Sequence, residues 1–158
     1  MTKFKRGHWL SFLVPAGLLL GAYGSQYIGG LVPCEMCWWQ RWPHFAAVPL
    51  AGLAFVISNP GLKRVLVALA AFAILTSGAI GGYHAGVEYG WWEGLSKCSG
   101  VPTGSGADVM RQILEAPTIR CDVSPWTLFG ISLAGFNFLL STGAAIAILG
   151  LIARDKSA

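Results

Sequence analysis

The sequence predicts an all-α membrane protein, a bundle of four transmembrane helices with a short amphipathic helix in its second outer loop. The chain of 158 residues is 54% hydrophobic and only 11% charged, with a mean hydropathy of +0.59. Charged residues make up about a quarter of soluble domains. The apolar runs are long and lack strict alternation, which favours helices over half-buried strands. Its length suits one membrane domain, residues 1–158.

Four apolar segments are expected to cross the membrane. A helix needs about 20 mostly apolar residues to cross the bilayer core. The expected spans are about 8–30, 42–58, 65–87 and 126–153. The first span has a basic front and small residues at its end, so a cleaved signal peptide is the alternative interpretation there. The second is short and contains Pro43 and Pro49.

The charges between the spans predict the orientation. The N-terminus, the turn "NPGLKR" and the tail carry Lys3, Lys5, Arg6, Lys63, Arg64, Arg154 and Lys156, with Asp155 as their acid. The connections 31–41 and 88–125 are mainly acidic. Because cytoplasmic loops of membrane proteins are enriched in Lys and Arg, we expect both termini in the cytoplasm and both acidic connections outside. This corresponds to a multi-pass membrane protein.

Smaller patterns suggest how the spans pack. "GLLLG" (Gly17, Gly21) and "GAIGG" (Gly78, Gly82) predict close helix approach, although small residues are common in membrane helices. Asn137 is expected to form an interhelical hydrogen bond. In the second outer loop, "ADVMRQILEA" places apolar residues at helical spacing. It predicts an amphipathic helix on the membrane surface, or one packed on the rest of the loop.

The composition also bounds the partners. The sequence has no basic stretch interleaved with aromatics on a polar background, so nucleic-acid binding has no support. Neither a G-x-G-x-x-G nor a P-loop pattern occurs. The high hydrophobic fraction instead predicts that membrane lipid surrounds the protein.

All four cysteines lie in the two outer connections, Cys34 and Cys37 in one, Cys98 and Cys121 in the other. An oxidising compartment lets disulfides persist, so one disulfide in each loop is expected. A Cys98–Cys121 bond would stabilise its loop by roughly 3–4 kcal/mol on the chain-entropy model, which also suits a purely structural role. Cys34 and Cys37 enclose only two residues, so a C-x-x-C redox pair explains them better.

Other chemistry fits the cysteines less well. A Cys₄ zinc site is the alternative. However, Cys98 and Cys121 lack the C-x₂-C spacing of a zinc knuckle, and an oxidising compartment disfavours free thiolates. We therefore expect no metal. Haem attachment requires a histidine directly after C-x-x-C, and Trp38 stands there.

Two charged or titratable residues accompany the redox pair. Arg41 follows Cys37 by four residues, so a helix would place both on one face, where the cation supports a thiolate. An interfacial anchor among neighbouring tryptophans is the alternative role for Arg41. His84 precedes Glu88 by four residues near the outer end of the third span, which suits a proton path, a metal ligand or a polar interface residue.

These segments resemble a known family. "PCEMCWWQR" resembles the P-C-x-x-C-x-x-x-R signature of the bacterial disulfide bond formation protein B (DsbB) family. "YHAGVE" and "CDVSPWTLFGISLAGFN" resemble that family's third-span end and its entry to the fourth span. The resemblance covers nearly the whole chain.

The resemblance implies a thiol oxidase that reoxidises a periplasmic DsbA-like, thioredoxin-fold dithiol oxidase and passes electrons to membrane quinone, ubiquinone or menaquinone. It implies that the partner attacks Cys98 and that Cys121, once released, attacks Cys34. Cys37 would then face the quinone, with Arg41 stabilising the thiolate and the reduced ring. His84, Gln26 and Trp126 fall at positions that resemble quinone-side or loop-side residues.

Two other functions remain open from the sequence. A structural or transport protein with two inert disulfides would contain the same cysteines. A relay that reduces a periplasmic partner would need cysteines accessible to cytoplasmic donors, and the predicted inner side has none. The joint presence of C-x-x-C, Arg41 and a second outer cysteine pair favours the oxidase.

Overall fold

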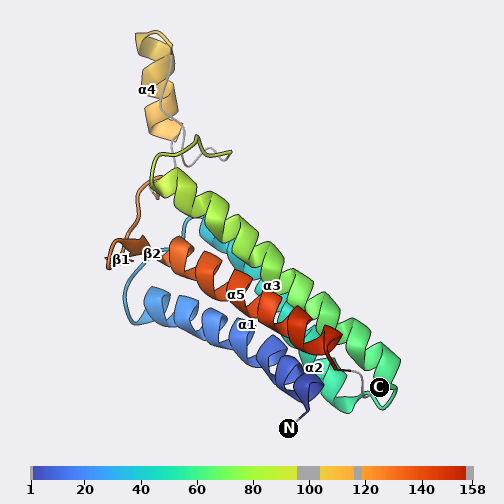
Figure 1. Cartoon of the computed structure of the whole chain (residues 1–158). Coiled ribbons are helices and arrows are strands. Elements are labelled where there is room, and N and C mark those ends of the chain that lie inside the picture. Colours follow the sequence, from blue (N-terminus) through green and yellow to red (C-terminus); the bar gives the residue numbers. More distant parts are fainter. Residues whose placement is uncertain (1, 96–103, 116–118, 156–158) are drawn as a thin grey trace.

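Four long helices run alongside one another in a bundle (Figure 1). They are α1 (Lys3–Tyr27), α2 (Glu35–Val56), α3 (Pro60–Glu88) and α5 (Leu133–Ala153). The computed structural model describes residues 2–95, 104–115 and 119–155. α3 packs mainly against α2 and α5, and α1 also packs against these two helices. The described part of the chain is mostly helical, as the sequence predicts.

The residue before each long helix receives a hydrogen bond from the helix's first turn. The side chains of Thr2, Asn59 and Ser132 accept from the backbone N–H groups of Lys5, Leu62 and Gly135. These residue types are preferred N-caps because their oxygens satisfy a free N–H group. Before α2 the same position holds Cys34, which places a sulfur at a helix N-terminus.

α2 begins earlier than the predicted span. It starts at Glu35, so residues 35–41 are helical and continuous with the apolar segment that begins at Trp42. Pro43 therefore lies inside α2, not in its first turn. A proline within a helix removes one backbone hydrogen bond. The helix nevertheless continues through Pro43 and Pro49 to Val56.

α5 begins later than predicted. The segment from Trp126 is not helical until Leu133. Strands β1 (Thr127–Leu128) and β2 (Ile131–Ser132) pair antiparallel in between. The two residues joining them, Phe129 and Gly130, have φ angles of 52° and 77°. A right-handed helix excludes positive φ, whereas a two-residue hairpin turn requires it, so the apolar run is interrupted here.

Only one of the two predicted small-residue motifs brings helices together. A Cβ on Gly78 would lie 2.6 Å from Oγ1 of Thr142, and one on Gly82 would lie 2.8 Å from the Phe138 ring. This confirms a close approach of α3 to α5. At Gly17 and Gly21 no atom lies within 4 Å of an added Cβ, so the predicted close approach there is wrong.

The bundle interior is built mainly from small side chains. Its core cluster contains fully buried Ala47, Ala51, Ala70 and Ile74. The outer surface is also apolar, with Leu20 73% exposed and Ile146 63% exposed. Large apolar areas rarely face water in soluble monomers, so this surface indicates a lipid environment.

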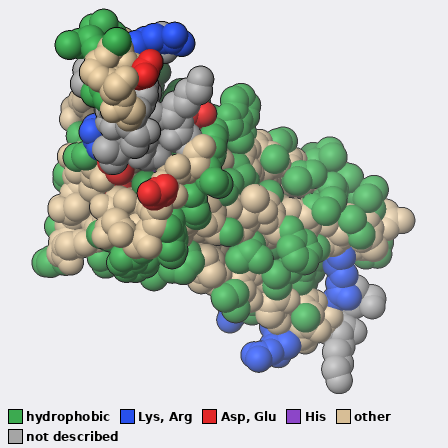
Figure 2. Space-filling view, turned by 90° about the horizontal axis from the view of Figure 1, so that it is seen from above, with side chains coloured by type: hydrophobic (Ala, Val, Ile, Leu, Met, Phe, Trp, Pro, Cys, Tyr) green, Lys and Arg blue, Asp and Glu red, His purple; other side chains and the backbone are tan. Residues whose placement is uncertain are grey.

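The charged side chains lie towards the ends of the bundle. On the face shown in Figure 2, Lys and Arg side chains lie at one end, and Asp and Glu side chains lie at the other together with further Lys or Arg side chains. A broad hydrophobic surface separates them. α3 and α5 are each long and apolar enough to cross a membrane.

A further helix, α4 (Gly106–Glu115), stands beyond one end of the bundle (Figure 1). Met110 and Leu114 are 58% and 78% exposed. An apolar face left uncovered suits a helix at a membrane surface. That location stays a prediction.

Candidate functional site

The C-x-x-C pair lies at the N-terminus of α2. Cys34 is the N-cap, and its sulfur accepts a hydrogen bond of 3.2 Å from the backbone N–H of Cys37. The two sulfur atoms lie 2.7 Å apart, and both cysteines are free thiols. Cys34 is 6% exposed, whereas Cys37 is half-buried. Both thiols therefore lie at the N-terminus of a helix, which also contains Arg41.

The environment differentiates the two thiols, which lie ahead of the apolar segment that begins at Trp42. A hydrogen bond to Cys37, together with burial, raises the pKa of the Cys34 thiol. The same hydrogen bond lowers the pKa of the Cys37 thiol, with a smaller contribution from Arg41. A helix N-terminus also favours a thiolate. These shifts favour ionisation of Cys37 before Cys34.

Arg41 is held inside the bundle between α1 and α2. Its guanidinium donates 2.7 Å to Oε1 of Gln26 and 3.2 Å to the carbonyl of Ala22. The group lies 5.1 Å from the ring centroid of Tyr23 and 4.8 Å from that of Trp38. Arg41 is only 6% exposed. These contacts orient the cation rigidly, which a surface anchor would not require.

A cavity of about 250 Å³ opens beside Cys37 and Arg41, between α1, α2 and α5. Its lining includes Cys37 and Arg41 together with Gly21, Leu133, Phe136 and Asn137. The absence of side chains at Gly17 and Gly21 leaves this space open. The site therefore combines a thiol, a buried cation and a largely apolar wall. Gln26, which the resemblance placed on the quinone side, is not part of the lining and contacts Arg41 instead.

His84 lies on α3 and faces the cysteines rather than the cavity. Its Nδ1 is 2.7 Å from the amide nitrogen of Gln40, so Nδ1 accepts this hydrogen bond. Nε2 therefore carries the ring proton and donates 3.1 Å to the carbonyl of Cys121. The same Nε2 lies 3.6 Å from the sulfur of Cys34 and 3.8 Å from Oε1 of Glu88. His84 thus contacts both cysteine segments at once.

Cys121 lies next to the C-x-x-C pair. It is disulfide-bonded and 1% exposed, in a buried cluster with Cys34, Met36 and Val87. Cys98, its expected partner, lies outside the described residues. The outer connections are far apart in sequence, yet the structure brings Cys121 and Cys34 into one cluster.

A buried polar network below the cysteines was not recognised from the sequence. Gln40 Oε1 accepts 2.9 Å from Asn137 Nδ2, and Asn137 Oδ1 lies 3.1 Å from Nε2 of His44. Ser77 and Ser141 join it at 2.9 Å and 2.8 Å, to His44 and Asn137 respectively. The interhelical hydrogen bond predicted for Asn137 is confirmed. Gln40 and His44, one helical turn apart beside an apolar segment, were the available signal.

Metal ligation has limited support. The sulfur atoms of Cys34 and Cys37 and a ring nitrogen of His84 lie within 4.8 Å of one another. A structural zinc ion takes four ligands. Cys121 is disulfide-bonded, so the Cys₄ alternative does not describe this state.

Comparison with known proteins agrees with this site. The sequence model of the family described as disulfide bond formation protein DsbB matches residues 5–151. The chain is 31% identical to disulfide bond formation protein B of Verminephrobacter eiseniae over 156 residues, covering 92% of this chain and 83% of the relative. It is 30% identical to the protein of that name from Xanthomonas oryzae pv. oryzae over 165 residues, covering 98% and 94%.

A third relative, disulfide bond formation protein B of Marinobacter nauticus, is 28% identical over 160 residues, which cover 92% of this chain and 93% of the relative. No solved structure gives a significant match. Because the family match extends through all four long helices and includes the paired thiols at the start of α2, the chain belongs to the DsbB family of membrane oxidoreductases that form disulfide bonds.

Proposed function

We propose that this protein is a thiol:quinone oxidoreductase of the bacterial inner membrane that reoxidises a periplasmic DsbA-like, thioredoxin-fold dithiol oxidase. In this proposal all four long helices cross the membrane. Both termini lie in the cytoplasm, because Lys and Arg predominate at that end. The cysteines then lie at the periplasmic edge, where they can meet both a soluble protein and a lipid-soluble electron acceptor.

One observation carries the proposal: the Cys37 thiol and the Arg41 guanidinium line the same largely apolar cavity. A redox thiol on a water-exposed loop would serve only soluble partners. A thiol on the wall of a cavity between membrane helices can also serve a membrane-soluble acceptor. The cavity volume of about 250 Å³ is slightly below the usual range of ligand pockets, which begins at about 300 Å³.

The residues of the cavity fit a quinone ring. Its apolar wall suits the ring faces, and Arg41 has N–H groups beyond those that it donates to Gln26 and Ala22, so it can donate to a ring oxygen. When bound, the quinone, ubiquinone or menaquinone, accepts the two electrons and two protons of a dithiol. Arg41 favours the Cys37 thiolate before the transfer, and the proton of Cys34 remains available beside it.

The thiol–disulfide steps follow from the resemblance. A thiolate of the partner attacks the sulfur of Cys98, the Cys98–Cys121 bond breaks, and Cys121 leaves as a thiolate. Cys121 then attacks Cys34 of an oxidised Cys34–Cys37 pair, and Cys37 leaves as a thiolate. The partner's second thiolate attacks the mixed disulfide and releases Cys98 as a thiolate. Cys98 then attacks Cys121, the Cys121–Cys34 bond breaks, the Cys98–Cys121 bond forms again, and Cys34 leaves as a thiolate. Each exchange forms one S–S bond and breaks one, and two electrons pass from the partner to the Cys34–Cys37 pair.

His84 and Gln40 support the exchange by position. The His84 Nε2–H group holds the Cys121 carbonyl, and the same nitrogen lies 3.6 Å from the Cys34 sulfur. Gln40 fixes the ring from the other side through Nδ1. We therefore assign His84 the role of aligning Cys121 with Cys34, in place of a quinone-side role, because His84 does not line the cavity.

The test uses purified protein in detergent, a reduced thioredoxin-fold periplasmic oxidase, and soluble ubiquinone and menaquinone analogues in separate assays. Quinone absorbance and remaining thiols are followed together. We expect one quinone reduced per two thiols lost, and no reduction by Cys37→Ser. A folded wild-type protein that reduces neither quinone would favour the alternative of inert disulfides.

A further inference from the structure

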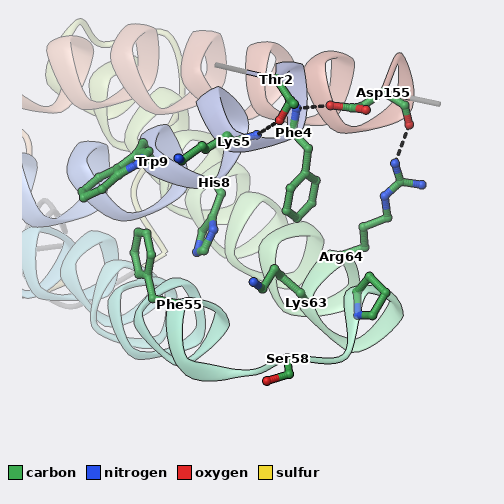
Figure 3. Close-up of a pocket in the computed structure, with 11 residues that line it drawn as sticks. Thr2, Phe4, Lys5, His8, Trp9, Phe55, Ser58, Lys63, Arg64 and Asp155 are labelled. Atoms are coloured by element: carbon green, nitrogen blue, oxygen red, sulfur yellow. Dashed lines mark hydrogen bonds between the residues drawn. The ribbon is translucent and has the colours of Figure 1, made fainter. Parts of the chain in front are cut away.

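A second cavity lies at the basic end of the bundle, opposite the cysteines. Its volume is about 560 Å³, and it is bounded by the start of α1, the α2–α3 turn, the start of α3 and the residues after α5. Figure 3 shows side chains from these elements around one space. Nothing in the proposed electron transfer uses this cavity.

Two ammonium groups in its lining have no hydrogen-bond or ion-pair partner within the part of the chain that the structure describes. Lys5 lies on α1 and Lys63 on α3, and both line the cavity. Neither ammonium group forms a hydrogen bond or ion pair with another described residue. Figure 3 shows Lys63 extending from α3 towards His8. Two cations from different helices therefore border one open space.

Arg64 adds a third positive charge to the lining. Its Nη2 donates to the backbone carbonyl of Asp155, and its guanidinium lies 5.8 Å from the Phe4 ring centroid. Nε of Arg64 is buried and has no hydrogen-bond partner among the described residues. The carboxylate of Asp155 accepts from the backbone N–H of Phe4. With three cations and one carboxylate, the lining has a formal charge of +2 if histidine is neutral.

The wall beside the cations is aromatic. His8 and Phe55 stack with ring centroids 3.9 Å apart, and Trp9 lies 4.9 Å from Phe55. The ring Nε2 of His8 lies 3.0 Å from the carbonyl oxygen of Ala51, which fixes the ring in this wall. Trp9 and Phe55 remain 41% and 40% exposed. Aromatic side chains in this arrangement are typical of a membrane–water interface.

We propose that this cavity binds an anionic phospholipid by its headgroup phosphate. Lys5 and Lys63 would hold the phosphate, and the acyl chains would pass Trp9 and Phe55 into the bilayer. Basic pockets between membrane helices on the cytoplasmic side suit such headgroups. A free phosphate would use the cations and leave the aromatic wall without a role. The predicted orientation makes the cytoplasmic leaflet the source of the lipid.

The test is a lipid titration of the full-length protein in a zwitterionic detergent, with bound lipids counted by native mass spectrometry. Phosphatidylglycerol is compared with phosphatidylcholine of the same acyl chains. We expect wild type to bind phosphatidylglycerol about tenfold more tightly. The double variant Lys5→Gln/Lys63→Gln should lose most of that difference. Equal binding of the two lipids by wild type would overturn the proposal.

The matched control is Lys3→Gln/Arg6→Gln, which removes the same charge from the same end without changing the cavity lining. It should retain the preference of wild type. An equal loss in both double variants would overturn the proposal in favour of diffuse attraction to anionic surfaces. Displacement of the lipid by millimolar glycerol 3-phosphate would overturn it in favour of a soluble-phosphate site. Thermal unfolding without lipid establishes that both variants fold.

Discussion

The guanidinium of Arg41 donates a hydrogen bond of 2.7 Å to the side-chain oxygen of Gln26, which lies on a different helix. This contact joins α2 to α1 beside the cavity that Cys37 lines. A buried cation is strongly constrained by its acceptors, because an unpaired charged donor is costly inside a protein. Gln26 therefore influences the cavity through the orientation of Arg41.

Replacing Gln26 tests this relationship. In Gln26→Leu, Nη1 of Arg41 loses its acceptor, and we expect the quinone KM to rise about tenfold. The rate of thiol exchange with the soluble partner should change little. Gln26→Glu keeps an acceptor oxygen and should retain the wild-type KM. Steady-state quinone reduction measures both variants, and an unchanged KM in Gln26→Leu would show that this contact does not support binding.

The two thiols of the C-x-x-C pair should differ in reactivity. The pKa of Cys37 is lowered and that of Cys34 is raised, so thiolate forms at Cys37 as pH rises while Cys34 stays protonated. In reduced protein, iodoacetamide labelling of Cys37 should increase through a midpoint below the ordinary thiol value of about 8.5. Peptide mass spectrometry after brief labelling from pH 5 to 9 measures this. Faster labelling of Cys34 would contradict the assignment.

His84 is expected to affect thiol–disulfide exchange with the partner and not the reduction of quinone. His84→Phe removes the donor to the Cys121 carbonyl and should slow electron transfer from the partner to the Cys34–Cys37 pair about tenfold. Quinone reduction by chemically reduced protein should remain near wild type, because His84 does not line the cavity. Rapid-quench thiol trapping separates the two steps. Slower quinone reduction with normal exchange would place His84 on the quinone side instead.

Filling the cavity should block the quinone step. Gly21 lines the cavity, and an added Cβ there meets no atom within 4 Å, so Gly21→Leu can fold and occupy the space. We expect at least about tenfold lower quinone-dependent turnover, since a ligand cannot share a filled pocket. Gly24→Leu is the matched control on α1, because Gly24 is equally open but lies outside the lining. Equal turnover in both variants would place the acceptor elsewhere.

The contact between α3 and α5 should limit substitution at Gly81. A Cβ there would lie 2.9 Å from Nδ2 of Asn137 and 3.0 Å from the Ala134 carbonyl. Overpacking of this kind costs about 1–3 kcal/mol, so Gly81→Ala should lower the free energy of unfolding by that amount. Gly150→Ala on α5 meets no atom and should not destabilise the protein. Reversible denaturation in micelles compares the two.

Local patterns predicted much of the fold and of the site. The apolar runs indicated four long helices, and the spacing of Cys34 and Cys37 indicated a redox pair, because both depend on residues that are neighbours in the chain. The start of α5 was missed since a hairpin at Phe129 and Gly130 interrupts an apolar run whose composition also suits a helix. Cys98 lies outside the described residues, and its role stays a prediction.

What the sequence by itself determined about this protein is its helical membrane character, the charge at each end and the paired thiols ahead of an arginine. Only the tertiary structure decided that Gln26 holds Arg41, that Gln40 and His44 join a buried network, and that His84 faces Cys121. Helical periodicity specifies which residues share a face. It does not specify how each helix is rotated against its neighbours, and that rotation determines which polar side chains meet.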